Sequence, residues 1–110
     1  MMERYAIAAA RIRKELVNVE QVIERAERAL ASIEQNLQDS DLYLDSAALN
    51  LHDFYAGLER IFRQIAASVD QTVPTGPEWH RELLQQMNVS IAPTRPQVLS
   101  DDTMKAIDEY

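Results

Sequence analysis

Apolar and small side chains recur at alternating steps of four and three residues through the first third of the chain. A period of 3.5 that is held for more than four heptads predicts one long helix over residues 3–38, and neither Pro nor Gly interrupts it. Such a stripe is normally covered by another helix, so we expect it to be buried against a partner. Its members are Tyr5, Ala9, Ile12, Leu16, Val19, Ile23, Ala26, Leu30, Ile33 and Leu37.

A second long helix is predicted over residues 41–69, after a break with capping residues at 39–41. The short connection favours an antiparallel arrangement of the two helices. Gly57 in mid-helix costs about 1 kcal/mol relative to Ala, and we attribute it to the close approach of another helix. The apolar stripe is wider than the first, which predicts more than one neighbour. It contains Leu51, Phe54, Tyr55, Leu58, Ile61, Phe62, Ile65 and Val69.

Two shorter helices are expected in the remainder. Pro77 suits the first position of a helix that runs to about Met87, with Thr75 or Gly76 as its cap. Residues 88–99 contain two prolines and are predicted to be irregular. Ser100 then caps a fourth helix. Its apolar stripe of Met104, Ile107 and Tyr110 reaches the last residue of the chain, so we interpret this helix as truncated.

Composition narrows the class of protein. With 110 residues, 46% hydrophobic and 26% charged, the sequence is expected to form a single helical domain over residues 1–110. It has no cysteine, no signal-peptide pattern and no apolar run of about 20 residues, which favours the cytoplasm. The net charge of −7 argues against broad nonspecific nucleic-acid binding. RNA contact at a local basic spot, or across a dimer, stays open.

Motifs that would reveal an enzyme from the residues alone are absent. The two histidines, His52 and His80, have no zincin spacing, and no glycine-rich loop or nucleophile elbow occurs. We therefore expect no metal and no cofactor. His52 beside Asp53 is either a general base or a partly buried structural residue, and Trp79 is interpreted as the anchor of the third helix. Asp53, Glu59 and Arg63 fall at near-helical steps and are interpreted as a solvated or interface face.

The run from Leu51 to Phe62, LHDFYAGLERIF, resembles the signature segment of HepT-like proteins in the HEPN superfamily. Two further blocks agree in order and spacing. The segment GPEWHRELL, residues 76–84, together with Met87 is similar to that family's third helix, and Arg95-Pro96 is similar to the loop before its fourth. The resemblance covers nearly the whole chain from about Ile7.

The resemblance implies an all-α fold: a HEPN-like antiparallel bundle of two long and two shorter helices. It also implies a homodimer that acts as the toxin of a toxin–antitoxin module, with a nucleotidyltransferase antitoxin as partner and RNA as substrate. Family members cleave RNA without metal, using an Arg and a His separated by four to six residues. His would act as general acid or base and Arg would stabilise the phosphorane charge. Tyr55 and Glu59 are the candidates for lining the cleft.

The sequence departs from the family at that motif. None of its arginines has a His at the required spacing, and the chain ends at Tyr110, just before the place where the motif would follow. We therefore expect a C-terminally incomplete domain that holds no catalytic residue and does not cleave RNA. The alternative is a non-enzymatic helical module for interaction or dimerisation. A helical adaptor unrelated to toxins is the third, generic interpretation.

Overall fold

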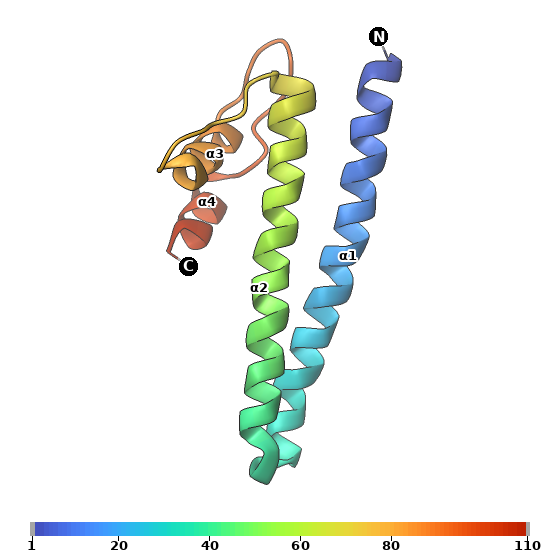
Figure 1. The fold of residues 1–110 in the computed structure, drawn as a ribbon, viewed down its shortest axis with the longest axis vertical. Helices are drawn as coiled ribbons and strands as arrows, with labels where there is room; N and C mark the ends of the chain where they lie inside the picture. The colour runs from blue at the N-terminus through green and yellow to red at the C-terminus, as the bar shows by residue number, and fades with distance from the viewer. Residues whose placement is uncertain (1, 110) are drawn as a thin grey trace. The chain divides into compact units, whose positions relative to one another are not determined.

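The computed structural model describes residues 2–109, with side chains from Tyr5 onward, and consists of helices joined by short connections. The α-helices are α1 (Met2–Gln35), α2 (Ser40–Ile65), α3 (Trp79–Asn88) and α4 (Asp101–Asp108) (Figure 1). A 3-10 turn at Leu37–Asp39 joins α1 to α2, and a π-helical segment, Ala66–Asp70, extends α2. No strand forms within the described residues, where pairing is limited to one bridge between Ile91 and Arg95. The all-α prediction is confirmed.

The chain divides into two compact units. One comprises residues 10–61, an antiparallel hairpin of α1 and α2 that we call the hairpin unit (Figure 1). The other comprises residues 2–9 and 62–109 and contains α3 and α4. The single-domain expectation for residues 1–110 stays a prediction. Across the described residues, no helix is long and apolar enough to span a bilayer.

In the hairpin unit, α1 and α2 pack along a line of buried and half-buried residues that we call the seam. On α1 these residues recur at alternating steps of three and four. Within this unit Val19, Val22 and Ala29 are buried. Side chains of intermediate exposure complete the same period at Ile12, Glu15, Ala26 and Ile33. On α2 the matching period contains Tyr43, Ala47, Asn50, Phe54, Gly57 and Ile61. Small residues are frequent on both sides, which lets the helices approach closely.

The buried positions of α1 differ from the predicted apolar stripe at every second member of that stripe. Ile12, Val19, Ala26 and Ile33 do belong to the seam. Leu16, Ile23 and Leu30, predicted beside them, do not, because the seam passes through the residue immediately before each. Leu37 lies in the 3-10 turn that follows the end of α1. The exposed fractions are 43% for Leu16, 37% for Ile23, 52% for Leu30 and 75% for Leu37.

Helix boundaries also differ from the prediction at the hairpin turn. α1 ends at Gln35 rather than Gln38, because the Asn36 side chain donates to the Ser32 carbonyl and its backbone leaves the helical region at φ −139°. At the other end, Gln71 adopts φ 59° and terminates the π-helical segment, with Thr72 N donating to Ala66 O.

The second unit has its own small core around Met87, which is fully buried, together with Leu83 and Leu99. The Met87 carbonyl accepts from the backbone nitrogens of Val98 and Leu99, at 2.9 and 3.0 Å. These bonds hold the proline-containing segment against the end of α3. That segment includes a cis Ala92–Pro93 bond.

The two shorter helices begin differently from each other relative to the prediction. Ser100 caps α4 as expected, since its side chain accepts from Thr103 N. The predicted start of the third helix is wrong. Gly76 has φ 99° and Trp79 N donates to its carbonyl, so Pro77 lies in a turn and the helix begins at Trp79 with Glu78 at the cap position. Tyr110 lies outside the described residues.

Candidate nucleic-acid interface

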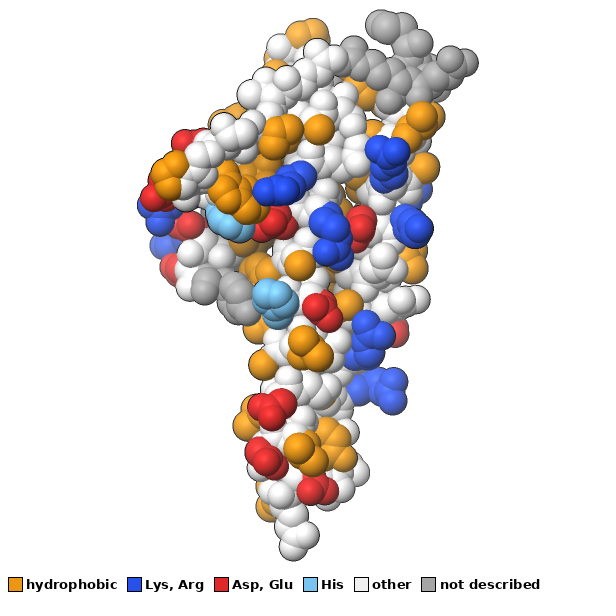
Figure 2. Space-filling view, in the orientation of Figure 1, with side chains coloured by type: hydrophobic (Ala, Val, Ile, Leu, Met, Phe, Trp, Pro, Cys, Tyr) orange, Lys and Arg blue, Asp and Glu red, His pale blue; other side chains and the backbone are white. Residues whose placement is uncertain are grey.

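Charge is sorted between the two sides of the hairpin unit. Residues 10–61 contain six basic side chains. Because the seam fixes which way each helix is turned, five of them project on one side of the pair, which we call the basic face. In the space-filling view, basic side chains follow α1 along its border with α2 (Figure 2). The basic face carries Arg11, Lys14, Arg25, Arg28 and Arg60, with Asp53 among them.

Acidic side chains concentrate elsewhere on the same unit. One group projects on the opposite side of the seam, where Arg13 is the one base. A second group projects directly away from the seam. The net acidic charge of the protein therefore conceals a local positive surface, because acids and bases occupy different sides of the same helices. These acids are Glu20, Glu27, Glu34 and Asp41 in the first group, and Glu24, Asp45 and Glu59 in the second.

A shallow hollow of about 250 Å³ lies in the middle of the basic face. Arg25 and Arg60 line it, and Asn18, Gln21 and Asp53 supply amide and carboxylate groups. Val19 and Val22 of the seam form the remainder of its wall. Two guanidinium groups beside amide donors provide the chemistry that a phosphate group and its ester oxygens require.

Both arginines of the hollow are oriented by the seam. Arg60 Nε donates to Oε1 of Glu15 at 3.1 Å, and Arg25 Nε donates to Oδ1 of Asn50 at 3.2 Å. Asn50 is buried and its amide nitrogen donates to the Ser46 carbonyl. Each guanidinium is thus held through Nε, and its two outer nitrogens remain as donors for further hydrogen bonds.

The candidate cleft residues, Tyr55 and Glu59, lie one helical turn apart on α2, and both are half-buried. Phe54 contacts Tyr55 edge to face, with ring centroids 5.3 Å apart. Neither residue lines the hollow. Their assignment to a cleft stays a prediction.

The histidines occupy different settings. His52 is exposed, so the expectation that it is a partly buried structural residue is wrong. His80 is also exposed, and its ring stacks on Trp79 with centroids 3.4 Å apart. Arg63 lies over the same indole, 4.0 Å from its centroid. Trp79 thus connects α3 to the end of α2, as its interpretation as an anchor requires.

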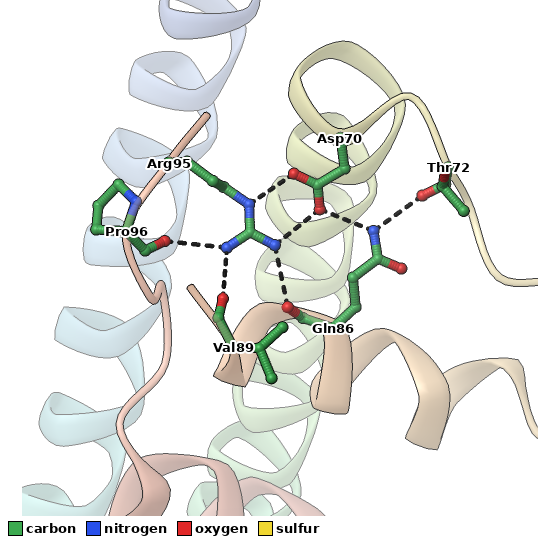
Figure 3. A network of polar contacts seen from close by, with 6 residues as sticks. All are labelled: Asp70, Thr72, Gln86, Val89, Arg95 and Pro96. Atoms are coloured by element: carbon green, nitrogen blue, oxygen red, sulfur yellow. Dashed lines mark hydrogen bonds and ion pairs between the residues drawn. The ribbon is translucent and has the colours of Figure 1, made fainter. Parts of the chain in front are cut away.

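Arg95 is held in a structural pair rather than at a surface site. Its Nε and Nη2 donate to the two carboxylate oxygens of Asp70, at 2.6 and 2.7 Å (Figure 3). Both side chains are almost fully buried. Nη1 donates to the carbonyls of Val89 and Pro96, and Gln86 bonds Asp70 from the other side. The hydrogen bond from Arg95 keeps the pKa of Asp70 below its ordinary value, against the opposing effect of burial.

Comparison with known protein families shows which family this chain belongs to. The family model described as HepT-like protein matches residues 46–110, which is more than half of the chain. The protein belongs to the HepT-like family. The match includes α3, α4 and most of α2, and therefore all three blocks on which the resemblance was based. No curated protein and no solved structure matches the chain.

Sequence reasoning missed the basic face of this HepT-like protein. The bases of α1 are not grouped in the sequence-based interpretation, and the predicted stripe lies one residue past the seam at alternate positions. The signal was present in the spacing of Arg11, Lys14, Arg25 and Arg28, which repeat by fourteen residues. Within the described residues, no group of three or more potential metal ligands gathers.

Proposed function

We propose that this protein is the toxin-type component of a HEPN/nucleotidyltransferase toxin–antitoxin module. The family activity is metal-independent RNA cleavage. In this chain, RNA is bound through the basic face but not cut, since no Arg–His pair occurs at the family spacing within its 110 residues. The protein acts in the cytoplasm.

The observation that carries the RNA-binding part of this proposal is the sorting of charge on the hairpin. Five bases lie on one side, with Asp53 among them and Glu15 paired to Arg60, and they offer a positive track to a phosphate backbone. Arg11 and Arg28 are 17 residues apart, which is about 26 Å along a helix and long enough to contact several phosphates of a single strand. A net charge of −7 spread evenly would instead repel RNA.

The test compares two neighbouring bases that project on opposite sides. Lys14→Glu and Arg13→Glu change the net charge equally. We expect Lys14→Glu to weaken binding of a labelled single-stranded RNA and to reduce the salt slope of the affinity by about 1, whereas Arg13→Glu changes neither beyond the general charge effect. Fluorescence anisotropy at several salt concentrations measures both quantities.

Equal losses for the two variants would refute the basic face as the RNA-binding surface. Absence of RNA binding by the unmodified protein at low salt would do the same. Circular dichroism of each variant confirms that the helices are intact before affinities are compared.

Two protein partners belong to the proposal through the family: a second copy of this chain and a nucleotidyltransferase antitoxin. Homodimer formation predicts a mass that rises with concentration in sedimentation equilibrium. A monomer that persists to high micromolar concentration would refute it.

The alternative function is a non-enzymatic interaction module. It is favoured by a specific observation: five large apolar side chains on one side of the hairpin unit are exposed. A surface of this kind is suited to protein contacts whether or not the chain binds RNA.

A further inference from the structure

Leucines and one isoleucine form a continuous apolar surface along one side of the hairpin unit, opposite the basic face. We call this surface the leucine face. On α1 its members follow the seam residues Glu15, Val22 and Ala29 by one position, and on α2 they follow Tyr43 and Asn50 by one. In antiparallel helices these positions lie on the same side of the pair. Its members are Leu16, Ile23 and Leu30 from α1, with Leu44 and Leu51 from α2.

The two helices contribute to this face alternately. Asn50 is hydrogen-bonded to Arg25, so Leu51 lies between the levels of Ile23 and Leu30. From Leu16 to Leu30 the surface extends about 21 Å, four turns of helix. The exposed fractions of Leu44 and Leu51 are 54% and 41%. Contiguous apolar surface on this scale marks an interaction site.

The charged residues that border the leucine face indicate the chemistry of its binding partner. Glu20, Glu27 and Glu34 recur every seven residues along α1, each four positions after a leucine-face residue. Such carboxylates lie directly beside the apolar stripe and about 10.5 Å apart. Charges at these flanking positions select partners in helix–helix pairing. A complementary helix therefore needs Lys or Arg at every seventh position.

We propose that the leucine face binds an amphipathic helix of another protein, one whose apolar stripe is flanked by Lys or Arg at heptad spacing. The apolar side chains come from two antiparallel helices and extend along the hairpin, which suits a single helix laid lengthwise over them. A second copy presenting the same face would set glutamate against glutamate, and like charges in that position weaken association. This partner is independent of RNA binding, which uses the opposite side.

The test uses two synthetic helical peptides with identical apolar stripes. One carries Lys and Arg at the flanking heptad positions, and its twin carries Glu there. We expect the full chain to bind the basic peptide at least about tenfold more tightly than the acidic one at low salt. The double variant Glu20→Lys/Glu27→Lys should reverse that preference.

A matched pair of apolar substitutions locates the site. Leu30→Gln lies on the leucine face, and Leu49→Gln changes a leucine that is 62% exposed on the side of the basic face. Leu30→Gln should weaken the basic peptide about tenfold and Leu49→Gln should not. Both side chains are exposed, so thermal unfolding should remain near that of the unmodified protein for each.

Three results would overturn the proposal: equal affinity for the two peptides, equal effects of the two leucine substitutions, or no binding of either peptide at about 100 μM. Loss of self-association in Leu30→Gln would assign the face to a second copy instead. None of these results bears on the RNA measurements with Lys14→Glu, so the failure of one proposal is distinguishable from the failure of the other.

Discussion

Gly57 of α2 lies so close to Val19 of α1 that a Cβ built on the glycine would be 2.7 Å from Cγ2 of the valine. Real Cβ atoms do not approach carbon atoms this closely, so a larger residue at either position must move the helices or the valine. The prediction that Gly57 marks a close helix approach is confirmed, and the partner is now identified. This contact fixes how near the two helices come at the centre of the hairpin.

We therefore expect Gly57→Ala to destabilise the protein by about 1–3 kcal/mol, although alanine is the better helix former. The same substitution in a Val19→Ala background should be neutral or should stabilise by up to about 1 kcal/mol, since the shorter side chain leaves room for the new methyl group. Urea unfolding of the four proteins gives the coupling energy. If Gly57→Ala is equally harmful in both backgrounds, Val19 is not the obstructing residue.

The position of the seam is tested by two adjacent residues of α1. Val22 is 7% exposed and Ile23 is 37% exposed. We expect Val22→Ala to cost about 2 kcal/mol and Ile23→Ala less than about 1 kcal/mol, even though the second substitution removes more atoms. If Ile23 were buried, as its place in the predicted apolar stripe implies, Ile23→Ala would instead cost about 2–5 kcal/mol. Chemical denaturation of the two variants separates the interpretations, provided that the slope with denaturant is unchanged.

The buried pair of Asp70 and Arg95 should make stability depend on acid pH. Since folding lowers the pKa of Asp70, its contribution is present in full above the unfolded-state pKa of about 4 and is lost as pH falls through the folded-state pKa. Asp70→Asn should cost about 3 kcal/mol at pH 7, because it leaves the Arg95 charge unpaired in a buried site. The difference in unfolding free energy between the two proteins should shrink from pH 5 to pH 3. A difference that stays constant over this range would mean that the carboxylate is not ionised in the pair.

Arg95→Lys provides the companion variant. It preserves the charge but cannot form the two-point contact with Asp70 or reach the three carbonyls that surround the guanidinium. We expect it to be destabilised at pH 7 as well, with a pH dependence in the same direction as in the unmodified protein, because the carboxylate is still paired with a cation.

The 110-residue chain should bind RNA without cutting it. Cleavage through the ribose 2′-hydroxyl needs a proton acceptor, a proton donor and a cation at the phosphate. His52 and His80 lie in different compact units, and neither has an arginine at the family spacing. Incubation with a mixed RNA pool in EDTA, followed by mapping of RNA ends, measures this. Specific cleavage that His52→Ala or His80→Ala abolishes would show that an active site has been overlooked.

Much of the fold follows from local signals. Ser100 with an acidic first turn is enough to begin α4, and the break after Gln35 needs only the competition of the Asn36 side chain for backbone groups. The start of α3 could not be predicted in this way. Pro77 is compatible with a first helical position and with a turn, and the positive φ of Gly76 selects the turn.

The basic face also depends partly on the sequence and partly on the tertiary structure. The sequence supplies the bases and their spacing, but a face is defined only after the rotation of each helix about its axis is known. That rotation brings Arg60 of α2 to the side that holds Arg11, Lys14, Arg25 and Arg28 of α1. It leaves Arg13 on the other side. No property of the separate helices would place these residues together.

What the sequence determined by itself is an apolar stripe on α1 that is wider than one seam. Val19 and Ala26 are each followed by two apolar candidates, three and four positions later, whereas Ile12 is followed by the charged Glu15 and by Leu16. Only the tertiary structure chose between them. The approach of Val19 to Gly57 brings the backbones close, and this spacing favours the smaller flank of Val22 and Ala29 over the larger side chains of Ile23 and Leu30. The leucines that did not fit became the exposed face.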